Sequence, residues 1–98
     1  MISFTKHTLK KIETLMGELG YTIRYEKGSF NSGYCLVEKR KIAIINRFYD
    51  AEARINALLD ILFSIKVDPQ MFSETSTKLW SKIKKHHDVI EEDTVNDK

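Results

Sequence analysis

The chain has 98 residues, of which 42% are hydrophobic and 31% are charged, and its formal net charge is +2. These values are typical of one globular domain and argue against a disordered chain or a membrane protein. Cys35 is the single cysteine, which excludes an intrachain disulfide and fits a reducing compartment, so we expect a cytoplasmic protein.

Charge is unevenly distributed along the chain. Residues 88–98 carry five acidic residues and one lysine, which leaves fifteen basic and nine acidic residues before them. This charge pattern indicates an acidic, mobile tail over residues 88–98. We expect the preceding residues 1–87 to form a single α+β domain. Charged and polar side chains interrupt the apolar runs, so we expect neither a secretory signal nor a membrane span.

The first predicted element is an amphipathic helix. Apolar residues recur at spacings of three and four from Leu9 to Leu19, which places them on one stripe of a helix. Thr5 or Ser3 can cap the start of this helix, and Gly20 can adopt the left-handed conformation that ends it.

Three strand-like runs follow the first helix. Residues 21–26 alternate in polarity as in a half-buried strand, and residues 34–38 form a second run. Residues 42–45 are apolar on both faces, so we expect this run at the centre of the sheet or covered on both sides. The pattern leaves open whether the tyrosines of these runs are core or exposed residues: Tyr21, Tyr25 and Tyr34.

Two connections between these strands are predicted to be exposed. Residues 27–33 form a glycine-flanked loop whose tip carries Phe30 and Asn31. Residues 38–41 form a charged hairpin turn, although they lack the glycine pairs that fix the register of tight hairpins.

Two helical regions complete the predicted fold. Asp50 is a suitable N-cap for a helix whose apolar residues repeat from Ile55 to Ile65 and which Val67-Asp68-Pro69 ends. Beyond it we expect a C-terminal helix with a break near Thr75. The expected fold class is α+β, with a small, mainly antiparallel three-stranded sheet packed with two or three helices in the order helix, sheet, helix, helix.

No set of residues predicts catalysis. His7 is far in sequence from the adjacent His86 and His87, and Cys35 has no zinc-ligand spacing around it. The apolar neighbours of Cys35 favour an inert buried thiol over a nucleophile. We therefore expect no enzyme, no catalytic or cofactor-binding residue, no cofactor and no metal.

One segment resembles a known enzyme core. A hairpin that ends in Ile42-Ala-Ile-Ile-Asn46, a short loop and the helix Arg54–Phe63 are similar to the core of small ImmA/IrrE-type zincin metallopeptidases. This resemblance places Leu59 and Phe63 at the two histidine positions and Asp60 at the glutamate position. It implies a fold without the activity, because Leu and Phe cannot bind zinc. The chain as a whole also resembles small bacterial proteins, which implies no particular function.

Three functions are compatible with these patterns. We prefer a non-catalytic intracellular module that acts through protein association or self-association, because the two-sided apolar strand and the aromatic residues offer more apolar surface than a small body hides. The alternatives are nucleic-acid binding through a basic, aromatic sheet surface, and a degenerate zincin-like domain without peptidase activity. The expected interaction surface consists of Phe30, Asn31, Lys39, Arg40, Lys41, Arg47, Phe48, Tyr49 and Trp80.

Overall fold

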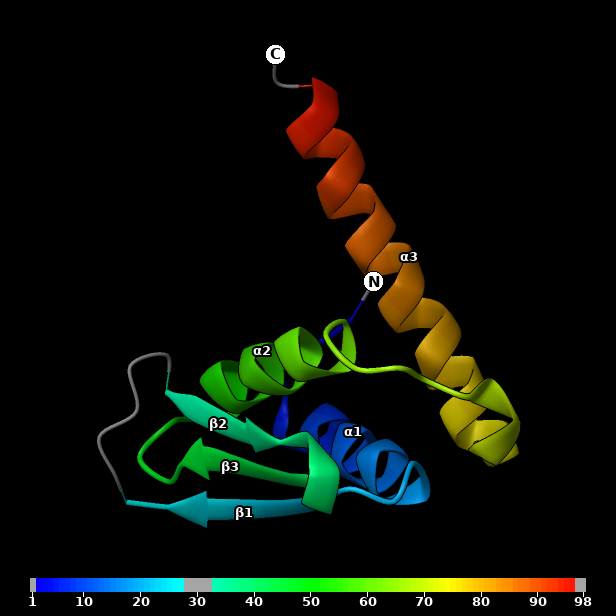
Figure 1. Cartoon of the computed structure of the whole chain (residues 1–98). Helices are drawn as coiled ribbons and strands as arrows, with labels where there is room; N and C mark the ends of the chain where they lie inside the picture. Colours follow the sequence, from blue (N-terminus) through cyan, green and yellow to red (C-terminus); the bar gives the residue numbers. More distant parts are fainter. Residues whose placement is uncertain (1, 28–32, 97–98) are drawn as a thin grey trace.

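The computed structural model describes residues 2–27 and 33–96, with side chains through His87 (Figure 1). In chain order its elements are α1 (Lys6–Glu18), β1 (Thr22–Glu26), β2 (Tyr34–Val37), the 3₁₀ turn η1 (Glu38–Arg40), β3 (Ile42–Asn46), α2 (Ala51–Leu62), the 3₁₀ turn η2 (Pro69–Met71) and α3 (Glu74–Asn96). This order confirms the predicted α+β fold and its sequence of helix, sheet, helix, helix.

The sheet is mixed, and the prediction of a mainly antiparallel sheet is wrong. β3 lies between the other two strands and pairs parallel with β1 and antiparallel with β2. β2, which follows β1 in the chain, therefore lies on the far side of β3 from β1. The strand that is apolar on both faces thereby takes the central position, which is the most protected place in a sheet.

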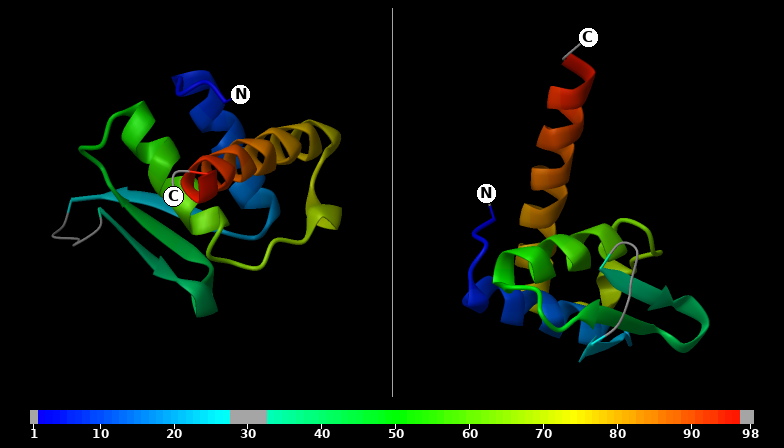
Figure 2. Two further views of the ribbon diagram at one scale, coloured as in Figure 1. Left: turned by 90° about the horizontal axis from the view of Figure 1, so that it is seen from above. Right: turned by 90° about the vertical axis from the view of Figure 1, so that its left-hand side faces the viewer.

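α1 and α2 both cover one face of the sheet and leave the other face open (Figure 2). Ala43 and Ile45 point toward the helices and are fully buried, whereas Ile42 and Ile44 point the opposite way and are half-buried. The strand register places Ile23, Tyr25, Tyr34 and Leu36 on the covered side. Of the two alternatives expected for residues 42–45, the structure shows the central position in the sheet, and the helices cover only one face of this strand.

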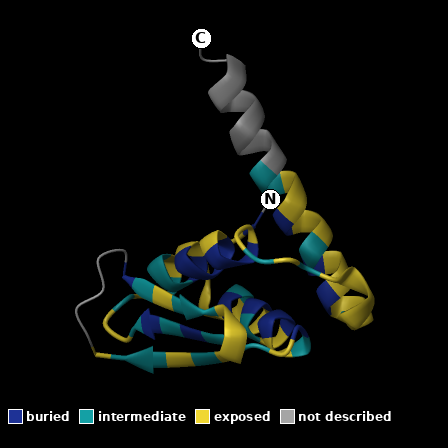
Figure 3. Ribbon diagram, in the orientation of Figure 1, coloured by how far each residue is buried: buried dark blue, intermediate teal, exposed yellow. Residues whose placement is uncertain are grey.

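The hydrophobic core lies where α1 and α2 meet each other and the sheet (Figure 3). Its largest fully buried side chains are Ile12, Leu15, Met16, Ile45, Ile55, Leu58, Ile61, Leu62 and Ile83. The first half of α3 packs on α1 through Leu79 and Ile83, and the helix then runs away from this body (Figure 1). Because α3 continues through Asn96, the backbone of the predicted tail prolongs this helix, and the mobility of the tail stays a prediction.

Capping side chains fix the helix starts where the sequence predicts them. The Thr5 hydroxyl accepts a hydrogen bond from the backbone N–H of Thr8 at 3.3 Å, and the Asp50 carboxylate accepts one from Ala53 at 2.9 Å. Gly20 follows α1 with φ of +87°, the left-handed conformation expected of it.

α2 ends earlier than predicted. The backbone N–H and the hydroxyl of Ser64 both donate to the Ile61 carbonyl, at 3.0 and 2.8 Å, which closes the helix at Leu62. Ile65 therefore lies outside the helix, although its spacing fits the apolar stripe. Asp68 accepts from the N–H of Gln70 and starts η2, and α3 begins only at Glu74.

Candidate functional site

The open face of the sheet, meaning the side that α1 and α2 do not cover, carries alternate residues of all three strands. Val37 lies opposite Ile42, and Cys35 lies opposite Ile44, so apolar side chains occupy β2 and β3. β1 adds a polar margin beside them. The open face therefore consists of Thr22, Arg24, Glu26, Cys35, Val37, Ile42, Ile44 and Asn46.

The polar margin of the open face is electrically balanced. Arg24 Nε lies 2.6 Å from Glu26 Oε2, and both side chains are partly exposed, at 56% and 39%. An exposed pair of this kind contributes at most about 1 kcal/mol to stability. Because the charges of Arg24 and Glu26 cancel, the open face has no excess charge that would repel a second apolar surface.

Cys35 is exposed on the open face, so the prediction of a buried thiol is wrong. Its neighbours Tyr34 and Leu36 pack against the core, but side chains alternate between the two faces of a strand. The apolar neighbours in sequence therefore describe the opposite face. In space, Cys35 lies beside Ile44 of β3.

The predicted interaction residues do not form one continuous surface. Lys39 and Arg40 lie in η1 and Lys41 follows them, at one end of the sheet. The loop 47–49 lies at the other end, separated from them by the length of β3. Trp80 is on α3, and Phe30 and Asn31 fall outside the described residues.

The loop between β3 and α2 holds an aromatic side chain outward. Phe48 is 67% exposed, and its backbone N–H donates to the Asn46 side-chain oxygen at 3.0 Å. Arg54 of α2 holds the loop in place by donating hydrogen bonds to the carbonyl oxygens of Arg47 and Tyr49, both at 2.9 Å. The Arg47 guanidinium also lies 5.2 Å from the Phe48 ring centre. These contacts order the loop and hold the Phe48 side chain in an exposed position.

The Tyr25 side chain faces the interior of the molecule. Its hydroxyl donates a hydrogen bond to the Glu13 carboxylate, and the Arg54 guanidinium lies 4.1 Å from its ring centre. Burial, followed by the hydrogen bond to Glu13, raises the pKa of Tyr25 far above its ordinary value. Tyr34 lies on the same covered side, so the eight residues of the open face include no aromatic side chain.

Trp80 joins α3 to the end of α2. Its ring stacks on Phe63 at 5.9 Å and contacts Phe72 at 6.0 Å, and Phe63 in turn stacks on His87 at 3.9 Å between ring centres. Trp80 is half-buried in this row of aromatic rings. Trp80 therefore acts as a packing residue between α3 and the end of α2.

The residues at the predicted zincin positions share α2 or its end. Leu59 is buried in the core, Asp60 is exposed, and Phe63 belongs to the aromatic contact with Trp80. Within residues 2–27 and 33–87, no group of three His, Cys, Asp or Glu side chains is placed to hold a metal ion. Among the helices that the structure describes, none has the length and apolarity needed to cross a membrane.

Comparison with other proteins assigns neither a family nor a function to the chain. No family model, no curated protein and no solved structure matches the chain. The resemblance to the ImmA/IrrE-type zincin core accordingly stays a prediction.

Proposed function

We propose that this protein acts by association, and that its open face binds a second copy of the same chain. The observation that supports this function is the position of Val37, Ile42 and Ile44, which are half-buried on the side of the sheet that lacks a helix layer. A strand that is apolar on both faces is typical of a sheet covered on both sides. Covering these side chains would gain about 25 cal/mol for each Å² of apolar surface removed from water.

A second copy suits this face because the face is apolar at its centre and its charged margin is neutral. A two-fold axis that runs parallel to the sheet, in front of its open face, would bring the two apolar centres together. The margin carries one positive and one negative group, Arg24 and Glu26, which pair with each other, so it has no net charge to oppose the approach of a second copy. Cys35 and Ile44 would then lie inside the interface.

The association is tested by changing one side chain at the centre of the open face. In light scattering after size exclusion, we expect a dimer for the natural sequence and a monomer for Ile44→Lys. Burying an unpaired ammonium costs on the order of 3 kcal/mol, which weakens the dimer about a hundredfold. Circular dichroism checks that Ile44→Lys stays folded, as expected for a side chain that does not face the core.

Asn56→Lys is the matched control, because it adds the same charge to an exposed position of α2, away from the open face. It should leave the dimer intact. A monomeric natural sequence at the highest soluble concentration would contradict the proposal. So would an Ile44→Lys variant that still dimerises.

Nucleic-acid binding is a second proposal. The exposed turn Lys39-Arg40-Lys41 supports it, because such groups can contact phosphates. Arg24 is paired with Glu26, and Tyr25 and Tyr34 face the helices, so base stacking on the open face receives no support.

A further inference from the structure

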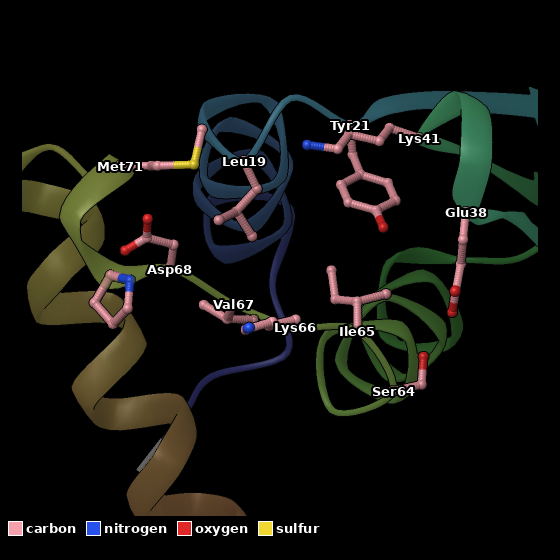
Figure 4. Close-up of a pocket in the computed structure, with 11 residues that line it drawn as sticks. Leu19, Tyr21, Glu38, Lys41, Ser64, Ile65, Lys66, Val67, Asp68 and Met71 are labelled. Atoms are coloured by element: carbon pink, nitrogen blue, oxygen red, sulfur yellow. The ribbon is translucent and has the colours of Figure 1, made fainter.

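A cleft of about 630 Å³ lies at the η1 end of the sheet, opposite the β3–α2 loop (Figure 4). Three segments that are distant in sequence line it. Leu19 and Tyr21 come from the turn after α1, Glu38 and Lys41 come from the hairpin turn, and the third wall is residues 64–69. A volume in this range accommodates a small organic molecule.

The floor of this cleft is apolar. Leu19 is buried, Ile65 and Val67 are half-buried, and Met71 completes the lining with 47% of its surface exposed. The Tyr21 ring lies beside them and points its hydroxyl toward Ile65 (Figure 4). These side chains would contact the apolar body of a ligand.

Charged groups of both signs surround that floor. Lys41 and Lys66 supply ammonium groups, and Glu38 and Asp68 supply carboxylates. In the described part of the chain, neither ammonium group lies within 4.0 Å of a carboxylate. Asp68 uses one oxygen to accept a hydrogen bond from Gln70, whereas the Glu38 carboxylate takes no such bond from the described residues. The four formal charges cancel, which favours a ligand that also carries both signs.

Lys41 reaches the rim of the cleft from an unfavourable backbone conformation. Its φ of 53° and ψ of 51° lie in the left-handed region, which costs a residue with a Cβ on the order of 1 kcal/mol. Its side chain passes over Gly20, where an added Cβ would lie 3.6 Å from the Lys41 amine. A lysine thus stands where the backbone favours glycine, and its amine lies beside the cleft (Figure 4).

Tyr21 adds a hydrogen-bond donor. Burial, and then the Glu38 carboxylate, raise the pKa of Tyr21 above its ordinary value. Even an ordinary tyrosine keeps its proton at neutral pH, so this hydroxyl is a donor there. Over the residues that the structure describes, this hydroxyl has no hydrogen-bond partner. It is therefore available to a polar group of a ligand that lies over Ile65 (Figure 4).

We propose that this cleft binds a small zwitterion with an apolar body, the class to which apolar α-amino acids belong. The ligand carboxylate lies between the amines of Lys41 and Lys66, and its ammonium group faces Glu38. The apolar body covers Ile65 and Val67. This site is separate from the open face and does not depend on association.

Titration of isotope-labelled protein with L-phenylalanine, followed by amide chemical shifts in NMR, tests the site. We expect saturable shifts confined to residues 19–21, 38–41 and 64–71. Two matched compounds each lack one charge: 3-phenylpropanoate lacks the ammonium group, and 2-phenylethylamine lacks the carboxylate. Each should bind at least about fivefold more weakly, because it loses one charge-assisted contact.

Lys41→Gly is the informative variant, because it removes the amine and suits the left-handed backbone. It should stay folded and bind L-phenylalanine about fivefold more weakly. Lys39→Ala, which removes a neighbouring charge outside the cleft, should bind as the natural sequence does. The proposal is overturned by shifts that do not saturate up to about 10 mM ligand, by equal binding of the three compounds, or by equal binding of the two lysine variants and the natural sequence.

Discussion

Gly33 fixes the end of the sheet next to the β3–α2 loop. Its φ is +81°, and an added Cβ would lie 1.6 Å from the Tyr49 hydroxyl oxygen. The Tyr49 ring thus occupies the space that a side chain at residue 33 would need. Tyr49, which the sequence suggests for an interaction surface, is half-buried in this contact.

Gly33→Ala should lower the free energy of unfolding by about 2 kcal/mol or more, because the left-handed backbone and the contact with Tyr49 both oppose a Cβ. Urea denaturation measures this change. Gly17→Ala is the matched control, since Gly17 lies in α1 with no atom within 4 Å of the added Cβ. That change should stabilise the protein by up to about 1 kcal/mol. Equal stability of the two variants would contradict the described packing of Tyr49.

One carboxylate connects the end of α1 to the start of α3. Glu18 Oε1 accepts a hydrogen bond from the backbone N–H of Ser73 at 3.0 Å, just before α3 begins at Glu74. This bond is the largest cause that lowers the pKa of Glu18. The charged carboxylate therefore favours the docked position of α3.

Glu18→Gln should reduce the loss of stability in acid. Because the folded state lowers the pKa of Glu18, its contribution is present above the ordinary carboxyl pKa and is lost as the pH falls through the lowered value. Thermal unfolding between pH 7 and pH 3 measures this contribution. We expect the variant to be less stable than the natural sequence near neutral pH, with a difference that shrinks toward acid. A constant difference across this range would contradict the assignment.

Local signals account for what the sequence predicted well. The caps at Thr5 and Asp50 and the apolar spacing of α1 and α2 depend on residues a few positions apart, which a single sequence displays. The order of the strands and the exposure of Cys35 depend on which distant segments meet. The residues predicted as one interaction surface lie apart in the structure for the same reason. The cleft could not be predicted, because its three walls come from segments far apart in the chain.

In the whole molecule, α1, α2 and the first half of α3 lie on one side of a thin sheet (Figure 2). A single copy therefore buries one face of its central strand and leaves Ile42 and Ile44 half-exposed to water on the other. Domains usually bury the apolar faces of their elements against a second layer. In this protein we propose that a second copy supplies that layer.

Cys35 reports on this arrangement without any substitution, because it lies on the open face and is exposed in one copy. The most direct measurement is the rate at which a maleimide reacts with Cys35 over a wide range of protein concentrations. We expect fast labelling in dilute protein and progressively slower labelling as dimer forms, with fast labelling at all concentrations in Ile44→Lys. A labelling rate that stays constant while light scattering reports a dimer would show that the chains associate through another surface.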